Sequence, residues 1–253
     1  MIYHYKEAPI FYQIYGQGPV VVLLHGFLES SKMWHGLIPT LQNSKKVIAI
    51  DLPGHGQSGN FSKVHTMESM AAVVFLLLKY LDVDKIELIG HSMGGYVGLA
   101  FIEAYGGMVD KFTILNSTTL PDSEVQKKKR DRAARLISEN KKTFVNNIMN
   151  VLFIPSAHES HGKEIAALKR EAQSFSEAGI IAATLGMKER PDRTAVLKAF
   201  NKEKVIICGD EDPVIPLGTS KALAATTQAR LEVLKGGHMS WLENHQEFVN
   251  LCT

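Results

Sequence analysis

The sequence predicts an α/β fold: a mostly parallel, eight-stranded sheet with helices on both faces and an inserted helical segment. Short runs rich in Val and Ile alternate with longer stretches of helical spacing, which is typical of a parallel sheet covered by helices. This alternation stops from Leu120 to about Asp192, where apolar residues recur only at helical spacing. The 253 residues suffice for one large domain with an insertion.

The predicted strands are short apolar runs separated by turn residues. They lie near residues 2–6, 10–15, 20–24, 46–50, 85–89, 111–116, 204–208 and 230–234. The first two border Pro9 and are rich in tyrosine, which favours an antiparallel hairpin at an edge of the sheet.

Helices are predicted between these strands and throughout the insertion. Outside the insertion they lie near residues 31–42, 66–80, 93–105, 217–225 and 240–251. Inside it, Phe144, Ile148 and Leu152 are spaced as on one face of a helix. We therefore expect a core domain formed by residues 1–119 and 193–253. Residues 120–192 are expected to form a helical cap.

Composition argues against several classes of function. The formal charge of +2, with 45% hydrophobic and 21% charged residues, is ordinary for a soluble protein and gives little attraction for nucleic acid. The longest apolar stretch, Ala71–Leu78, is too short for a membrane span. Residues 1–7 lack the apolar core of a signal peptide, and Cys208 and Cys252 lack metal-site or disulfide-framework spacing. We expect a cytoplasmic protein without metal or cofactor.

One serine stands between glycines in Gly90–Gly95, GHSMGG, where a predicted strand leads into a predicted helix. A tight turn there pushes the side chain of Ser92 out of the sheet, and it crowds backbone against backbone, where Gly90 and Gly94 have no side chains to collide. A serine hydroxyl also needs a base to take its proton and donors to stabilise the oxyanion formed on attack. The pattern predicts Ser92 as a nucleophile.

Two backbone N–H groups are expected to bind that oxyanion. Met93 begins the helix after Ser92, so its N–H is free and points toward the exposed oxygen. The strand that ends at Leu24 continues into a glycine-containing loop at the carboxyl edge of the sheet, where the Phe27 N–H is the expected second donor. The Phe27 side chain is expected to form a pocket wall, and His25 to brace the loop by hydrogen bonds.

The base and its carboxylate partner are expected on loops after later strands. His238 lies in the stretch GGHM after the last predicted strand, on a loop flexible enough to bring its imidazole over Ser92. Three acids follow strand 204–208. Asp212 precedes a proline that restricts its backbone and so fixes its side-chain direction, which favours it as the partner of His238, with Asp210 as the main rival.

With Ser92, Asp212 and His238 in this chain order, the sequence resembles the α/β-hydrolase superfamily over nearly its whole length. The stretch Asp51–Ser58, DLPGHGQS, looks like the family's loop after the strand that precedes the nucleophile strand. The resemblance implies the α/β-hydrolase fold, a Ser-His-Asp triad and a cap at the position of the insertion. Serine rather than aspartate at position 92 argues against haloalkane dehalogenases and epoxide hydrolases.

The resemblance implies acyl transfer from a carboxylic ester to water but leaves the substrate open. The predicted cap is rich in apolar side chains, so we expect a small, largely apolar ester. The cap residues expected at the pocket are Phe144, Ile148, Met149, Phe153 and Met187. C–C bond hydrolases and carrier- or thioester-directed esterases remain alternatives, as does a small-molecule receptor with an intact triad and slow turnover.

The run from Lys127 to Arg135 is the most basic part of the chain. Residues 122–139 carry six positive and four negative side chains, which is typical of a solvated helix face. Its alternative role is docking of an acidic carrier or a coenzyme A ester. His158 and His161 form an H-x-x-H pair that a metal could use, but the sequence places no supporting ligands near it.

Overall fold

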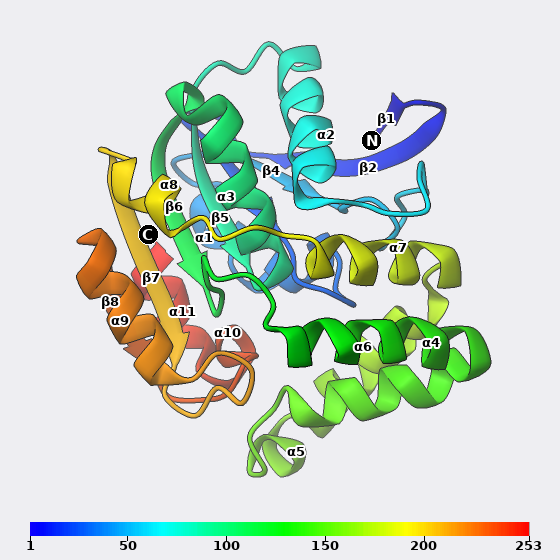
Figure 1. Cartoon of the computed structure of the whole chain (residues 1–253). Helices are drawn as coiled ribbons and strands as arrows, with labels where there is room; N and C mark the ends of the chain where they lie inside the picture. The colour runs from blue at the N-terminus through cyan, green and yellow to red at the C-terminus, as the bar shows by residue number, and fades with distance from the viewer. Residues whose placement is uncertain (253) are drawn as a thin grey trace.

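The computed structural model describes residues 1–252, and an eight-stranded sheet forms its centre (Figure 1). The strands lie side by side in the order β1-β2-β4-β3-β5-β6-β7-β8. Their bounds are β1 (Ile2–Tyr5), β2 (Ala8–Tyr15), β3 (Val20–Leu24), β4 (Lys46–Ile50), β5 (Ile86–His91), β6 (Val109–Leu115), β7 (Glu203–Gly209) and β8 (Arg230–Leu234). Pairing is antiparallel from β1 to β2 and from β2 to β4, and parallel elsewhere. The predicted parallel sheet and edge hairpin are confirmed.

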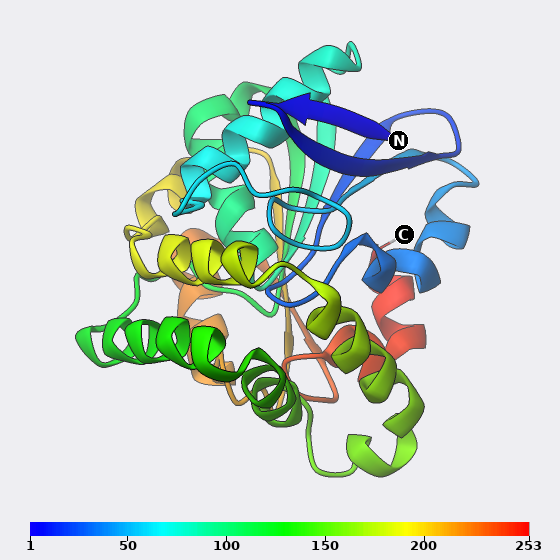
Figure 2. The ribbon, with the colours of Figure 1, turned by 90° about the vertical axis from the view of Figure 1, so that its right-hand side faces the viewer.

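Helices cover both faces of the sheet (Figures 1 and 2). One face carries α2 (Met67–Tyr80), α3 (Met93–Tyr105), α8 (Thr194–Ala199) and α9 (Leu217–Thr227). The other carries the 3₁₀ helix η1 (Ser31–Gly36), α1 (Ile38–Leu41), α10 (Ser240–Glu243) and α11 (His245–Cys252). A short 3₁₀ helix, η2 (Gly106–Met108), joins α3 to β6. This double cover explains why residues 21–24 and 47–50 are apolar without alternation, since both faces of their strands are buried.

Two predicted helices are each split in two. Residues 31–42 form η1 and α1, because Pro39 lacks the N–H that a continuous helix requires and instead lies in the first turn of α1. Residues 240–251 form α10 and α11, separated by Asn244 at φ −133° and ψ 55°. The other strand and helix ends lie within two residues of the predicted ones, and strands 20–24, 46–50 and 230–234 and helix 93–105 have the predicted bounds.

The insertion is helical, as its spacing predicts, and its two ends meet. It contains α4 (Glu124–Val151), α5 (Ala157–Ser160), α6 (Gly162–Ser174) and α7 (Glu177–Lys188). The Arg193 N–H donates to the Thr119 carbonyl at 2.9 Å, and the hydroxyls of Thr119 and Thr194 lie 2.7 Å apart. In both views these helices lie together along one side of the molecule, in green to yellow-green (Figures 1 and 2). Within residues 1–252, no helix is long and apolar enough to cross a membrane.

His55 is a fully buried histidine in the loop after β4. Its ring lies among those of His25, Phe27 and Phe175, with centroids 5.4 to 5.7 Å away. Nδ1 donates to the Pro53 carbonyl at 3.3 Å, while Nε2 has no partner within residues 1–252. The pKa of His55 is lowered to about 3, mainly because the ring is buried. The folded protein therefore keeps this imidazole neutral in mild acid.

We expect His55 to make the fold acid-sensitive. Below about pH 6.5 the unfolded chain binds a proton at this histidine that the folded chain excludes, so stability is complete above that pH and is lost as pH falls toward about 3. This single group should cost about 2 kcal/mol between pH 7 and pH 5. Urea unfolding should show that the free energy of unfolding falls less between pH 7 and pH 5 in His55→Asn than in the wild type. An equal loss in both proteins would contradict this assignment.

Candidate active site

Ser92 occupies a strained turn between β5 and α3. Its backbone has φ 48° and ψ −112°, a conformation that is costly for any residue other than glycine. A Cβ atom at Gly90 would collide with the carbonyl oxygen of Gly94, and one at Gly94 with that of Leu24. The Ser92 N–H donates to the Leu115 carbonyl at 2.9 Å, which ties the turn to β6. Both glycines are therefore required by close backbone approach.

The structure brings Ser92, His238 and Asp212 together. Ser92 Oγ lies 2.8 Å from Nε2 of His238, and Nδ1 of His238 lies 2.8 and 3.1 Å from the two oxygens of Asp212. The three residues come from loops after β5, β7 and β8, which end at the same edge of the sheet. The rival acid Asp210 instead forms an ion pair with Lys235 at 2.8 Å.

The Asp212 carboxylate is buried but well supplied with donors. It accepts hydrogen bonds from the Asn116 side chain at 2.9 Å and from the N–H groups of Val214 and Ile215 at 2.7 and 2.9 Å. Burial opposes ionisation, but His238 and these donors hold the pKa of Asp212 below its ordinary value. An ionised carboxylate only accepts, so Nδ1 of His238 carries the proton and Nε2 can accept the hydroxyl proton of Ser92.

The loop after β3 carries Phe27, which lines the same cavity as Ser92. Neither the Phe27 N–H nor the Met93 N–H has an acceptor within residues 1–252. His25 braces this loop: Nδ1 donates to the Gly26 carbonyl at 2.7 Å, and Nε2 accepts from the Leu52 N–H at 2.8 Å. With both ring nitrogens engaged and the ring fully buried, His25 is held in the loop rather than directed at Ser92.

A second buried pair, Glu29 with His91, was not predicted. Nδ1 of His91 donates to the Glu29 carboxylate at 2.7 Å, and Nε2 donates to the His238 carbonyl at 3.0 Å. The same carboxylate accepts the Gly26 N–H at 2.7 Å. Burial opposes charge on both groups, yet each stabilises the other, so the pKa of Glu29 is lowered and that of His91 is raised. This ion pair links the loop of Phe27 to the loop of His238.

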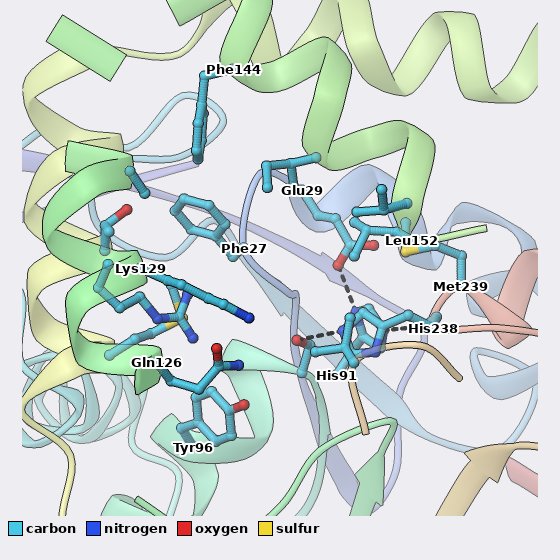
Figure 3. Close-up of a pocket in the computed structure, with 18 residues that line it drawn as sticks. Phe27, Glu29, His91, Tyr96, Gln126, Lys129, Phe144, Leu152, His238 and Met239 are labelled. Atoms are coloured by element: carbon cyan, nitrogen blue, oxygen red, sulfur yellow. Dashed lines mark hydrogen bonds and ion pairs between the residues drawn. The ribbon is translucent and has the colours of Figure 1, made fainter. Parts of the chain in front are cut away.

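A cavity of about 230 Å³ opens above Ser92 and His238 (Figure 3). Most of its lining is apolar, and the predicted cap residues Phe144, Ile148 and Met187 are part of it, as is the Phe27 side chain. The other apolar lining residues are Ala133, Val151, Leu152, Val214 and Met239, and the polar ones outside the buried pairs are Tyr96, Gln126, Lys129, Arg130 and Thr184. The cavity is slightly smaller than typical sites for drug-sized ligands, which suits a small substrate.

Met149 and Phe153, also expected at the pocket, do not line this cavity. Met149 is fully buried in the core cluster that includes Ile137 and Val145 of α4. Successive residues of a helix point about 100° apart, so Met149 faces into the helical packing when Ile148 faces the cavity. Phe153 follows the end of α4 and packs in the same core cluster. Helical spacing alone does not separate the packing face of a helix from its cavity face, which is why the sequence predicts Met149 and Phe153 at the pocket.

The H-x-x-H pair lies on the surface of the insertion. His158 donates to the Asn150 carbonyl at 3.1 Å, and Nδ1 of His161 lies 2.8 Å from the Ser160 hydroxyl. In the part of the chain that the structure describes, no three His, Cys, Asp or Glu side chains gather as metal ligands would.

Comparisons with known proteins agree on the family. A family model described as alpha/beta hydrolase fold matches residues 19–245. A thermophilic esterase from Thermogutta terrifontis, solved with malate bound, is 30% identical with a TM-score of 0.93, covering 97% of this chain and 92% of that one. Uncharacterized hydrolase YugF of Bacillus subtilis is 27% identical over 237 residues, 85% of this chain and 82% of its own length.

A further relative matches less than half of the chain. An uncharacterized protein of Mycobacterium tuberculosis is 32% identical over 116 residues, 46% of this chain, and the match spans 33% of that protein's length. The family model, by contrast, covers both the turn of Ser92 and the loop of His238. The chain therefore belongs to the α/β-hydrolase fold family.

Proposed function

We propose that this protein is a serine esterase that cleaves carboxylic esters of small, largely apolar molecules through an acyl-enzyme. The observation that carries the proposal is the unbroken series of hydrogen bonds from Asp212 through His238 to Ser92 at the floor of a mostly apolar cavity. The similarity to the Thermogutta esterase, at 30% identity over nearly the full chain, supports the same reaction class.

The first half-reaction acylates Ser92. His238 Nε2 removes the hydroxyl proton as Ser92 Oγ bonds to the carbonyl carbon of the ester, and the carbonyl electrons move onto oxygen. The N–H groups of Phe27 and Met93 would donate to this oxyanion, since neither has another acceptor within residues 1–252. When the tetrahedral species collapses, the alcohol leaves with the proton from His238. Ionised Asp212 stabilises the imidazolium in between.

The second half-reaction returns the enzyme to its starting state. A water molecule gives its proton to His238 Nε2 and bonds to the acyl carbon, and collapse releases the acid and reprotonates Ser92 Oγ. Asp212 keeps its proton-free form throughout, as its lowered pKa favours. Glu29 and His91 are proposed to hold the loops of Phe27 and His238 at the spacing that both steps require.

Substrate choice is assigned to residues 120–192, which we propose act as a cap. Phe144, Ile148 and Met187 supply apolar surface above Ser92. Filling a cavity of about 230 Å³ with an alkyl or acyl group removes apolar surface from water, which favours small apolar esters over long chains that would project out.

A panel of substrates tests this proposal. The protein is expected to hydrolyse 4-nitrophenyl acetate and butyrate with a kcat/KM well above that for the palmitate ester, and above that for matched acyl thioesters and for a vinylogous 1,5-diketone. Preference for the diketone would favour the C–C hydrolase alternative, and preference for acyl thioesters the carrier-directed one. Tight binding of these compounds without turnover would identify a receptor instead.

A further inference from the structure

Three side chains that line the cavity have polar groups without a hydrogen-bond or ion-pair partner in the described chain. They are Tyr96 of α3 and Gln126 and Lys129 of α4. The hydroxyl, the amide and the ammonium group make no hydrogen bond or ion pair with any other part of residues 1–252. Gln126 and Lys129 are three residues apart and so share one helix face. Figure 3 shows all three on the side of the cavity opposite His238.

The other charged side chains of the lining have ion-pair or hydrogen-bond partners. Glu29 pairs with His91, and Arg130 pairs with Asp122 at 2.9 Å. His238 is hydrogen-bonded to Asp212. Lys129 is therefore the unpaired charge of the cavity lining in the described chain, and it belongs to the basic run noted in the sequence.

The surroundings of these three side chains are positively charged. Asp122 accepts from Arg130 and also from Arg190 at 2.7 Å, so two cations share one carboxylate. The Arg190 guanidinium lies 4.1 Å above the centre of the Tyr96 ring, which connects this charged group to the cavity wall. With Lys129, three cations face one anion, a net charge of +2.

We propose that Tyr96, Gln126 and Lys129 form a binding subsite for a carboxylate carried by the substrate. The ammonium, amide N–H and hydroxyl groups are all donors, and a carboxylate offers two oxygens with about four acceptor positions. The substrate is then an ester with an apolar middle and an anionic end, whose ester group lies at Ser92 while its carboxylate lies across the cavity. This inference rests on the proposed function, since it assigns the far end of the same substrate.

Binding to the Ser92→Ala protein tests the subsite without turnover. Monomethyl glutarate and dimethyl glutarate differ only in whether one end is a free carboxylate. Titrations monitored by ligand NMR are expected to show that the monoester binds about tenfold more tightly than the diester. This difference in affinity corresponds to one charge-assisted contact at a partly exposed site. The succinate and adipate pairs, tested alongside, cover a shorter and a longer span between ester and carboxylate.

Matched lysine variants assign the preference to its residue. Adding Lys129→Met should remove the preference for the monoester, and Lys129→Glu should reverse it. Lys128→Met should leave the preference intact, because Lys128 does not line the cavity. Equal binding of monoester and diester in all three pairs, or a preference that survives in Lys129→Met, would overturn the subsite.

The two proposals fail in different ways. If the wild type hydrolyses neutral 4-nitrophenyl esters through Ser92 but the Ser92→Ala protein binds monoester and diester equally, the esterase proposal stands and the subsite is wrong. If the protein binds the monoesters selectively through Lys129 but hydrolyses no ester, the subsite stands and the esterase proposal is wrong.

Discussion

Replacing Ser92 with alanine is expected to lower kcat for 4-nitrophenyl butyrate by about 10⁶-fold, leaving only the catalysis that donors and binding supply. The reason is geometric, because Ser92 Oγ lies 2.8 Å from Nε2 of His238. The strained turn between β5 and α3 holds the hydroxyl in this position. Initial rates should be compared with spontaneous hydrolysis, because a 10⁶-fold loss brings the enzyme close to that background.

Ser138→Ala is the matched control for this variant. Ser138 is exposed on α4, and its hydroxyl donates only to the Ala134 carbonyl within the same helix. The control should hydrolyse the ester at the wild-type rate, and both variants should keep the wild-type circular dichroism spectrum. A Ser92→Ala protein that retains more than about a hundredth of the wild-type kcat would show that another group attacks the ester.

The Asp212→Asn variant is expected to lose about 10⁴-fold in kcat, with a smaller change in KM. Its amide can donate to Nδ1 of His238, which favours the tautomer with the proton on Nε2. That nitrogen then cannot accept the proton of Ser92. The N–H groups of Val214 and Ile215 would still face an oxygen, so we expect the loop to keep its conformation.

Asp210→Asn separates the two acids of this loop. Asp210 pairs with Lys235 near the surface and makes no contact with His238, so its variant should change kcat less than threefold, within the range of a surface charge change. If Asp210→Asn lost activity while Asp212→Asn kept it, the assignment of the acid would be reversed. Steady-state kinetics of both variants on one ester decides this.

The fold was predictable wherever local pattern and tertiary packing demand the same structure. Strand 20–24 has the predicted bounds because its apolar run is buried on both faces. Helix 31–42 was predicted as one element because its apolar spacing continues through Pro39, whereas the backbone divides there. The non-helical Asn244 has no comparable signal in sequence, since asparagine is compatible with a helix interior.

The site was predictable where one short stretch determines the geometry. Ser92 is identified by flanking glycines that close backbone contacts require, and Asp212 by the proline after it. The Glu29–His91 pair joins residues 62 positions apart, and no local pattern predicts such a contact. The same holds for Lys129: the adjacent Lys128 and Arg130 carry the same charge, and only the fold determines that Lys129 lines the cavity without a carboxylate partner.

Covalent labelling with a fluorophosphonate, followed by mass spectrometry of the digested protein, measures the reactivity of Ser92 most directly. An esterase with the geometry described here should take up one phosphonyl group per chain, at the peptide that contains Ser92, and lose ester hydrolysis in proportion. Labelling at a different residue, or full ester hydrolysis by protein that carries the label, would contradict the assignment of Ser92 as the nucleophile.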